Sequence, residues 1–323
     1  MTLRNVLRRQ CDSNCHSLRK VACPAQGAAI ASTRHLRRAA FTQVEFLVTI
    51  ALIFMLVSLI LPVIAKTRDV VRGSQCKDHL HNLGIAVENY VNSFGQFPAG
   101  SLVNTRPVKS VPGGDGFSWL VRLLPFVEQK PLYDTIDWSL PLEQQQRAPR
   151  LSIWIDLFRC PAADVDLNRQ PAISTYAGSH HSREAPIDID NNGLFLLGRG
   201  IQPVDVTDGL SHTLLVSEKG TPADDQGWAA GGRATLRNTG QSFARLDTDR
   251  PNSDPLYVGG FVSAHARGVH VTLADGATRL MSFDADHTLL QRLANRRDGE
   301  LISAAELTPE QFPQSSDGNG GQP

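Results

Sequence analysis

The residues that could carry chemistry in this chain are few and far apart, and two of them are cysteines. Beyond residue 40 the cysteines are Cys76 and Cys160, which stand 84 positions apart. A disulfide between them would stabilise the fold by about 4 kcal/mol in the chain-entropy model, provided that the compartment is oxidising. We expect this disulfide. The alternative is a pair of small, unbonded core residues.

A histidine upstream of an Asp-Gly pair is the second candidate. His265 is followed, after nine residues, by Asp275 and Gly276, and a histidine with a carboxylate invites an acid/base or metal-binding interpretation. Asp-Gly between two alternating apolar runs also predicts a type I′ hairpin turn, in which Asp275 is needed for its backbone conformation. We therefore expect structural roles: replacing His265 by Ala should lower the melting temperature rather than abolish a reaction.

An Asn/Asp-rich stretch resembles the opening of a calcium-binding loop. Asp188, Asp190 and Asn192 place oxygens at alternate positions, and Gly193 follows them. Arg199, however, stands at the twelfth position, where such a loop needs an acidic ligand. We expect a turn before a strand here, with calcium as the weaker alternative, and no other metal site.

Signatures of known enzyme classes do not occur. His180, His181 and Glu184 lack the order H-E-x-x-H, and the chain contains no G-x-S-x-G, P-loop or G-x-G-x-x-G sequence. Cys160 with a distant histidine could form a cysteine-hydrolase pair, but its Cys-Pro setting and its expected bond to Cys76 argue against this. The sequence therefore predicts a protein that is not an enzyme and has no cofactor.

The zero net charge of the 323 residues conceals a basic leader at residues 1–40. This leader contains eight Lys/Arg and one Asp, about +7, so the remainder carries about −7. A basic leader before an apolar segment is typical of membrane targeting, with the leader kept in the cytoplasm. The remainder has no basic run, which argues against a nucleic-acid partner. The leader's three cysteines, Cys11, Cys15 and Cys23, match no common zinc spacing.

Residues 41–65 form a segment that is apolar enough to cross a membrane. Its 19 residues from 46 to 64 are almost all apolar, and they would span about 28 Å as a helix. No A-x-A site follows, which disfavours an ordinary signal peptide. Glu45 near the start costs free energy in a membrane unless it is paired. No Lys or Arg lies within a helical turn of it, so its partner should come from another chain.

The junction at Ala40 resembles the processing site of type IV prepilins, since Arg37-Arg38-Ala39-Ala40 precedes Phe41-Thr42-Gln43-Val44-Glu45. The resemblance implies that a prepilin peptidase cuts between Ala40 and Phe41 and that Phe41 is methylated. It also implies that Glu45 neutralises the N-terminal amine of a neighbouring subunit during assembly, which would offset the cost of burying this carboxylate. Ala40 and Gln43 depart from the Gly and Leu that are usual there.

Beyond the membrane segment, residues 66–95 are expected to continue as an amphipathic helix. Its apolar face, with spacings of 4, 3, 4, 3 and 4, comprises Cys76, Leu80, Leu83, Val87, Tyr90 and Phe94. Residues 96–300 alternate short apolar runs with Gly, Pro, Asp and Asn, which is typical of an α+β head. We expect strands at 192–197 and 213–217, the hairpin at 269–273 and 278–283, and a helix from Asp286 to about Arg296. Residues 301–323 have the composition of a disordered tail.

Short motifs along most of the chain resemble a planctomycete family of pilin-like proteins whose function is not established. The C-terminal signature of that family, His-x9-Asp-Gly, matches residues 265–276. The further matches are Gln75-Cys76-Lys77, Leu83-Gly84, Tyr90, Gly95, Phe97-Pro98, Phe158-Arg159-Cys160-Pro161 and Thr207-Asp208-Gly209. The resemblance runs from Phe41 to about Glu300 and implies a pilin-like fold.

Together these features predict an α+β protein with a long, pilin-like membrane-spanning helix packed on a mainly antiparallel β-sheet head. The expected role is that of a pilin or pseudopilin subunit of a pilus-like or type II secretion-like assembly. It would be anchored once in the inner membrane, with its head in the periplasm or on the cell surface. Its partners would be the prepilin peptidase and, through the N-terminal helix, other pilin-like subunits.

Two other functions stay open at this point. One is a solitary anchored protein that binds a ligand, such as a polysaccharide, and never polymerises. The other, which the residues support less, is an anchored hydrolase. Glu45 favours the assembly subunit, because a plain anchor does not need a carboxylate inside its apolar segment.

Overall fold

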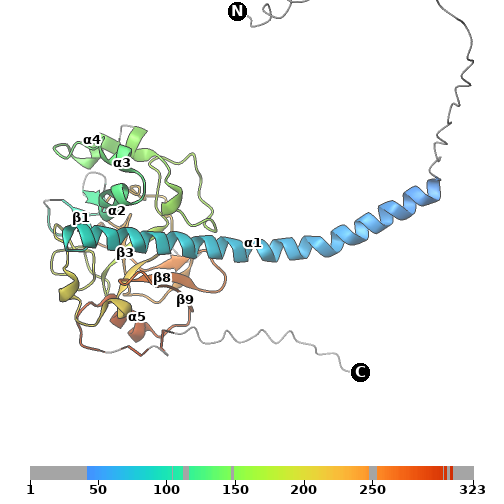
Figure 1. Cartoon of the computed structure of the whole chain (residues 1–323). Coiled ribbons are helices and arrows are strands. Elements are labelled where there is room, and N and C mark those ends of the chain that lie inside the picture. Colours follow the sequence, from blue (N-terminus) through green and yellow to red (C-terminus); the bar gives the residue numbers. More distant parts are fainter. Residues whose placement is uncertain are drawn as a thin grey trace, which may run out of the picture. The chain divides into compact units, whose positions relative to one another are not determined.

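The structure is a computed structural model that describes residues 42–103, 105–111, 116–146, 149–246, 253–300, 302–303 and 306–307. The basic leader, the processing residues Ala40 and Phe41, and nearly all of the predicted tail lie outside these residues. The chain divides into two units, which meet between Val57 and Ser58. Helix α1 (Gln43–Phe94) begins in the first unit and ends in the second (Figure 1).

Apart from α1, the elements of the second unit are short. The other α-helices are α2 (Trp119–Leu123), α3 (Lys130–Tyr133), α4 (Leu142–Gln146) and α5 (His287–Ala294). The 3-10 helices are η1 (Leu124–Phe126), η2 (Pro149–Ser152), η3 (Asp156–Phe158), η4 (Pro203–Asp205) and η5 (Leu210–His212). The strands are β1 (Ser101–Leu102), β2 (Phe117–Ser118), β3 (Tyr176–His181), β4 (Leu214–Glu218), β5 (Leu236–Asn238), β6 (Ala244–Arg245), β7 (Val262–Ser263), β8 (Val269–Leu273) and β9 (Thr278–Met281).

A five-stranded sheet with the order β5-β3-β4-β8-β9 forms the centre of the second unit (Figure 1). Neighbouring strands run antiparallel except β3 and β5, which are parallel. Two-residue pairings, β1 with β2 and β6 with β7, lie outside this sheet. The prediction of an α+β unit with a mainly antiparallel sheet is confirmed.

Helix α5 covers one face of this sheet and helix α1 covers the other, as the alternating side chains of β8 show. Val269 and Val271 are buried in one cluster with Leu290 of α5. Successive strand residues point to opposite faces, so His270 and Thr272 face α1, and α1 passes close to both. The sheet is therefore covered on both faces, and polar residues of β8 lie beneath a helix instead of facing solvent.

The second half of α1 packs on the sheet through the face that the spacing predicts. Its fully buried members are Cys76, Leu80, Leu83 and Val87. Tyr90 is partly buried, and Phe94 at the end of the helix is exposed. The predicted amphipathic helix is thus confirmed over the turns that cross the sheet.

Gly84 allows α1 to approach the β8–β9 hairpin closely. A Cβ atom at this position would lie 3.0 Å from Thr272 Cγ2 and 3.1 Å from Gly276 Cα. The ring of His81, on the same side of α1, hydrogen-bonds through Nδ1 to the Gly276 carbonyl at 3.2 Å. The absence of a side chain at Gly84, which weakens an isolated helix, is what permits this contact.

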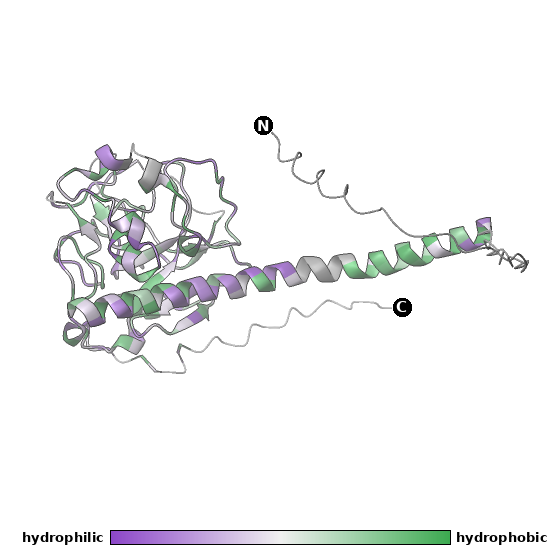
Figure 2. Cartoon of the chain, turned by 45° about the horizontal axis from the view of Figure 1, so that its top comes forward, coloured by the Kyte–Doolittle hydropathy of each residue, from purple (hydrophilic) through white to green (hydrophobic). Residues whose placement is uncertain are grey.

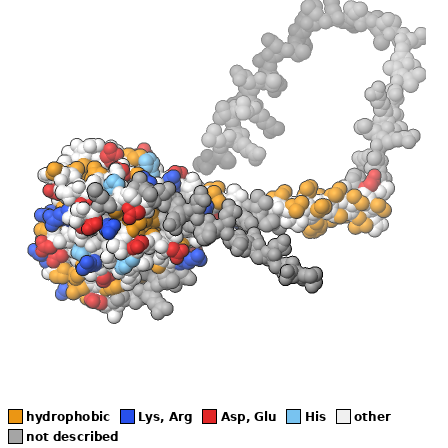
Figure 3. All heavy atoms as spheres, turned by 90° about the horizontal axis from the view of Figure 1, so that it is seen from below, with side chains coloured by type: hydrophobic (Ala, Val, Ile, Leu, Met, Phe, Trp, Pro, Cys, Tyr) orange, Lys and Arg blue, Asp and Glu red, His pale blue; other side chains and the backbone are white. Residues whose placement is uncertain are grey.

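The first part of α1 leaves its apolar side chains exposed. Gln43–Ile60 has a mean hydropathy of 2.3 and none of it is buried, so it is long and apolar enough to cross a membrane. Figure 2 shows that hydrophobic residues dominate this part of α1, and Figure 3 shows their side chains gathered around it. This segment is compatible with a single-pass anchor, as the sequence predicts.

The expected strand at 192–197 is wrong. This segment is buried but irregular, and the backbone N–H groups of Gly193 and Leu194 donate to the carbonyls of His180 and Ser179 without forming a ladder. Apolar runs bounded by turn residues are also found in buried connections, and the pattern by itself does not separate these from strands. The expected strand at 213–217 is confirmed as β4.

The hairpin of β8 and β9 is confirmed, but its turn is not type I′. Gly276 has a φ of +79°, and among the described residues only Glu128 is a non-glycine with positive φ, so Asp275 is not left-handed. The Gly276 N–H donates to the Leu273 carbonyl at 2.9 Å. These values indicate a type I turn followed by a left-handed glycine, another common hairpin connection.

The predicted C-terminal helix is confirmed as α5. Asp286 precedes it and accepts a hydrogen bond from the backbone N–H of Thr288 at 2.6 Å, which satisfies one of the free donors of the first turn. Leu290 and Leu293 are buried, and Leu289 packs against the same cluster.

Candidate functional site

Five potential metal-ligating or nucleophilic side chains meet around one carboxylate oxygen in the core of the second unit. Oε1 of Glu218 lies 2.7 Å from Cys76 Sγ and 3.9 Å from Cys160 Sγ. The same oxygen lies 3.0 Å from His265 Nε2 and 3.2 Å from His270 Nδ1. These five residues are called the Glu218 cluster below.

Each member of the Glu218 cluster comes from a different part of the chain. Cys76 lies on the buried face of α1, Glu218 ends β4, and His270 is the second residue of β8. Cys160 follows η3, and His265 lies in the connection between β7 and β8. The five side chains meet because α1 crosses the sheet over the ends of β4 and β8, next to the connections that carry Cys160 and His265.

Hydrogen bonds fix the orientation of the cluster members. The carboxylate of Glu218 accepts the backbone N–H of His270 through Oε2 at 3.1 Å, which leaves Oε1 facing the thiols and imidazoles. The hydroxyl of Tyr176 lies 3.1 Å from Cys76 Sγ. Cys160 is held by its backbone N–H, which donates to Thr175 Oγ1 at 2.6 Å.

Burial and mutual contacts shift the pKa values of this cluster in opposite directions. Burial raises the pKa of the Cys76 thiol, whereas the hydrogen bond from Cys76 lowers the pKa of Cys160 to about 6. Burial opposes protonation of His265, but Cys160 and Glu218 outweigh it and raise its pKa to about 10. Burial would raise the pKa of Glu218, yet its bonds to His265 and His270 hold it well below the usual range. These contacts therefore favour a charged carboxylate at Glu218, a protonated ring at His265 and a proton on Cys76 in preference to Cys160.

Three kinds of chemistry are available to such a cluster. Thiolates, imidazoles and a carboxylate are the ligands of zinc-class metal ions. Two neighbouring cysteines can form a disulfide, and both are free thiols in the structure, so the disulfide between Cys76 and Cys160 stays a prediction. Cys160 Sγ and His265 Nε2, 3.3 Å apart, also have the spacing of a nucleophile and its base.

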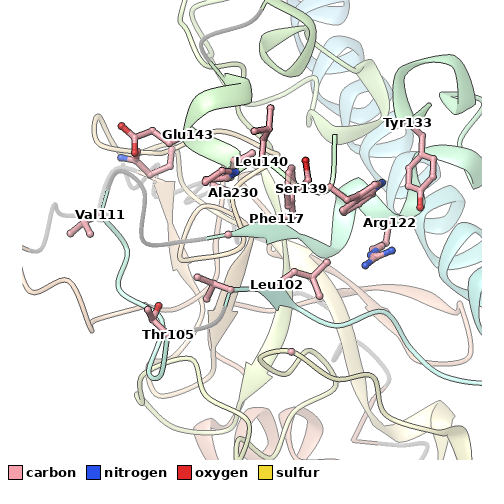
Figure 4. A pocket seen from close by; sticks show the side chains of 17 residues that line it. Leu102, Thr105, Val111, Phe117, Arg122, Tyr133, Ser139, Leu140, Glu143 and Ala230 are labelled. Atoms are coloured by element: carbon pink, nitrogen blue, oxygen red, sulfur yellow. The ribbon is translucent and has the colours of Figure 1, made fainter. Parts of the chain in front are cut away.

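A cavity of about 890 Å³ lies apart from this cluster, between the short strands β1 and β2 and helices α2 to α4 (Figure 4). Arg122 lies over the Trp138 ring, 4.4 Å from its centroid, and the rings of Phe117 and Tyr133 lie 5.1 Å and 5.6 Å from the same ring. Figure 4 shows Leu102 and Phe117 on neighbouring strands, with Arg122 and Tyr133 to one side. The cavity is thus an aromatic surface that carries a few polar groups.

A second cavity of about 580 Å³ adjoins the first, since Arg122 and Tyr133 line both. Its other aromatic residues are Tyr90, Phe94 and Phe126. None of the Glu218 cluster residues lines either cavity.

The signature residues His265 and Asp275 have different surroundings. His265 belongs to the Glu218 cluster, whereas the carboxylate of Asp275 accepts the Ala277 N–H at 3.0 Å within the β8–β9 turn. Gly276 supplies the left-handed residue of that turn. Asp275 therefore lies in the predicted turn, but it acts there through its side chain and not through a left-handed backbone. His265 has thiol and carboxylate partners that the sequence did not indicate.

The calcium candidates have other partners in the structure. Arg106 contacts Asp188 Oδ1 at 2.7 Å and Asp190 Oδ2 at 2.9 Å. Asn192 Oδ1 accepts the backbone N–H of Ser182 at 2.9 Å. A calcium ion would have to compete with these contacts, and the calcium site stays the weaker alternative.

Glu45 has a partner within its own chain. Its Oε2 accepts hydrogen bonds from the backbone N–H and the hydroxyl of Thr42, each at 2.9 Å, and the Glu45 N–H donates to Thr42 Oγ1 at 3.3 Å. Thr-x-x-Glu with these reciprocal bonds is a capping box, which satisfies free N–H groups at the start of a helix. An experiment on the predicted assembly role of Glu45 must therefore distinguish it from this capping role.

Glu218, His270 and Tyr176 were not predicted from the sequence. Glu218 and His270 each lie at or near an end of a strand whose other residues are mostly apolar, and a single polar residue there normally faces solvent. The alternation of β8 did place His270 and Thr272 on one face. Only the position of α1 over that face makes it an interior.

Comparison with known proteins gives a family but no activity. A family model described as a protein of unknown function, DUF1559, matches residues 65–287. No curated protein and no solved structure matches the chain.

Proposed function

Because this chain belongs to the DUF1559 family, whose function is unknown, we propose its role from its own residues: it is a membrane-anchored, pilin- or pseudopilin-like subunit. The proposed assembly is pilus-like or type II secretion-like, and subunits would associate through α1 after processing between Ala40 and Phe41. The observation that carries this proposal is Glu45, a carboxylate at the start of the exposed apolar segment Gln43–Ile60.

The proposed topology follows from charge and hydropathy. The basic leader stays in the cytoplasm, Gln43–Ile60 crosses the inner membrane once, and the second unit lies in the periplasm or on the cell surface. The partners are the prepilin peptidase and other subunits of the same kind. Nucleic acid is not proposed as a partner, and no enzymatic activity is proposed.

The capping box makes this proposal testable with two substitutions at one position. Glu45→Gln keeps an oxygen for the Thr42 hydrogen bonds, since Gln also serves in a capping box, but it removes the charge that would pair with a neighbour's amine. Glu45→Ala removes both. If the charge of Glu45 acts in assembly, neither variant assembles. If Glu45 acts only as a helix cap, Glu45→Gln assembles as the wild type does.

The measurement uses the full chain, co-expressed with a prepilin peptidase and extracted from membranes. N-terminal sequencing and mass should show a chain that begins at Phe41 with one methyl group, and cross-linking before extraction should show oligomers. Retention of the leader, or equal cross-linking in the wild type and both Glu45 variants, would contradict the proposal. The solitary anchored protein would then be the better interpretation.

The large cavity favours that second candidate function, the binding of a ligand such as a polysaccharide. Trp138 is 41% exposed and lies with Phe117, Tyr133 and Arg122 along the cavity. Aromatic faces with a few hydrogen-bonding groups are suited to ligands that present both apolar and polar surfaces.

Affinity electrophoresis of the detergent-solubilised chain in gels that contain cell-wall or extracellular polysaccharides tests this candidate. Trp138→Ala should abolish retardation by any polysaccharide that binds. Ile153→Ala, at a residue that is equally exposed but lines neither cavity, is the control. Equal retardation of both variants would remove the cavity from consideration.

A further inference from the structure

We propose that the Glu218 cluster binds one divalent metal ion of the zinc class, through Cys76, Glu218, His265 and His270. Cys160 lies beside these four ligands and can supply a second thiolate. This inference concerns the single chain and does not depend on whether the chain is an assembly subunit.

The spacing of the donor atoms is the first argument. One atom from each of the four ligands lies within 4.8 Å of the others, the only such group of four among the described residues. Cys160 Sγ lies 3.3 Å from His265 Nε2. Bonds of about 2.0–2.3 Å in a tetrahedral zinc site place ligand atoms about 3.3–3.8 Å apart. Small side-chain movements would therefore close these donors around an ion.

The chemical nature of the donors selects the metal. Sulfur and imidazole nitrogen favour zinc and neighbouring transition metals, whereas magnesium and calcium need mostly oxygen ligands. The cluster offers two sulfurs and two ring nitrogens but one carboxylate. A zinc-class ion fits this set, and an alkaline-earth ion does not.

The donor side chains are already held in place without an ion. Cys76, Glu218 and His270 are buried and His265 is half-buried. The His270 N–H, the Tyr176 hydroxyl and the Thr175 hydroxyl orient Glu218, Cys76 and Cys160. Outer partners of this kind fix the ligands in known metal sites. α1 also passes directly over the imidazoles, since a Cβ at Gly73 would lie 3.9 Å from His265 Nδ1.

Binding exchanges protons for the ion without oxidation or reduction. The Cys76 S–H bond and any N–H bond at a ligating ring nitrogen break, and their protons go to solvent. Metal–sulfur, metal–oxygen and metal–nitrogen bonds form in their place.

The other two chemistries of the cluster have less support. A catalytic Cys160 and His265 pair would need access for a substrate, but Cys160 is buried and neither cavity reaches it. A disulfide would use only two of the five side chains and would leave two imidazoles and a carboxylate in the core without explanation. The metal uses the imidazoles, the carboxylate and Cys76 directly, and Cys160 can supply a second thiolate.

The consequence for the fold is a clamp between α1 and the sheet. Cys76 is the ligand from α1, while Glu218 and His270 come from β4 and β8. A bound ion would hold the helix on the sheet at the level of the first buried turn. Binding to the folded state alone stabilises it, so the ion should raise the melting temperature of the head.

The test uses the full chain in detergent, with Cys11, Cys15 and Cys23 replaced by Ser so that Cys76 and Cys160 are the remaining thiols. The protein is reduced, stripped with a chelator and titrated with Co²⁺, then with Zn²⁺ against a chromophoric competitor. We expect one ion per chain and a thiolate-to-cobalt charge-transfer band that zinc abolishes. Cys160→Ser should weaken this band, and Cys76→Ser should remove most of it.

Substitutions of the imidazoles locate the site. Loss of a residue that only orients a ligand reduces metal affinity by about 10–100-fold. His265→Gln and His270→Gln should each reduce the affinity for Zn²⁺ by more than this. His79→Gln is the matched control, because His79 lies one turn from Cys76 on α1 and hydrogen-bonds the Arg159 carbonyl instead. Near-ultraviolet circular dichroism confirms that each variant is folded.

Two results would overturn the proposal. One is the absence of a charge-transfer band in the reduced wild-type chain, which needs no variant to fold; the predicted disulfide between Cys76 and Cys160 would then explain the two cysteines. The other is an affinity for Zn²⁺ that His265→Gln and His270→Gln leave unchanged.

Discussion

Two stretches of α1, Gln43–Ile60 and residues 76–87, are both helical, so their backbone N–H and C=O groups are hydrogen-bonded in the same way. Their side chains, however, lie in different surroundings. In the first stretch no side chain is buried. In the second, one face is buried against a sheet and contributes Cys76 to the Glu218 cluster. The contrast teaches that an apolar helix face is buried where the chain supplies a partner, and that the described residues supply none for the first stretch.

The two glutamates of these regions repeat the contrast. Glu45 has a neighbour three positions away, Thr42, and its surroundings can be read from the local sequence. Glu218 has partners from four other segments of the chain. Local hydrogen bonding orients the first carboxylate, and only long-range packing brings together the partners of the second.

The largest expected difference between the two stretches comes from truncating one leucine in each. Leu80→Ala removes a fully buried side chain and should lower the free energy of unfolding of the second unit by about 2–5 kcal/mol. Leu52→Ala, where the side chain is 55% exposed, should change it by less than about 0.5 kcal/mol. All four tryptophans lie in the second unit, so denaturation followed by their fluorescence measures the head alone. Equal losses would contradict the contrast.

Acid should destabilise the head while leaving the first stretch helical. Burial lowers the pKa of His180 to about 3, and its Nε2 has no hydrogen-bond partner among the described residues. The unfolded chain protonates this ring near its ordinary pKa of about 6.5. Stability is therefore fully present above that pH and falls by about 1.4 kcal/mol per pH unit below it, down to about pH 3.

Chemical denaturation of the detergent-solubilised chain at a series of pH values measures this slope. His180→Gln should flatten it, because glutamine does not titrate. His212→Gln, at a half-buried histidine, is the control. A slope that persists in His180→Gln would assign the acid sensitivity to another group.

Two glycines of α1 should respond to alanine with opposite signs. Gly73→Ala meets ordinary contacts, 3.9 Å and 4.0 Å, and should raise the free energy of unfolding by up to about 1 kcal/mol through helix propensity. Gly84→Ala would place a Cβ 3.1 Å from the Gly276 backbone, and the cost of overpacking, about 1–3 kcal/mol, should exceed the propensity gain. Thermal denaturation of both variants decides this. A stabilising Gly84→Ala would mean that α1 can move away from the hairpin.

The smallest effect is expected at the start of α1. Thr42→Ala removes the capping hydrogen bonds to Glu45 and should weaken the first turn by about 1 kcal/mol. The head, which lies in the other unit, should unfold at the same denaturant concentration as before. Hydrogen exchange of the amides that follow Thr42 measures the local change. A shift in the unfolding transition that tryptophan fluorescence reports would show that the start of α1 is coupled to the second unit, which would contradict this prediction.

Several elements could be predicted because their signals are local. The buried face of α1, the β8–β9 hairpin and the Asp286 cap each depend on residues within a few turns or a few strand positions. The prediction of a strand at 192–197 was wrong because strand formation there depends on distant residues. Its apolar residues are buried by β3 and β1, and pairing with distant partners, which no local pattern contains, decides whether a buried run becomes a strand.

The Glu218 cluster could be predicted only in part. Cys76 and Cys160 were placed together as a disulfide pair, and His265 was identified as a residue of interest, but for structure alone. Glu218 and His270 could not be found, because a polar residue among apolar ones in a strand usually marks the solvent face. Their meeting depends on three strands and a helix whose contacts are 52 to 142 positions apart in sequence.

The apolar segment, the periodic face of the following helix and the position of the hairpin turn could be predicted from the sequence. These follow from residues that are close together along the chain, where helix and strand periodicity act directly. Only the tertiary structure decided that α1 covers the polar face of β8, and therefore that two thiols, two imidazoles and a carboxylate share one buried volume. Burial is a property of what packs above a residue, and for Glu218 that neighbour is more than a hundred positions away.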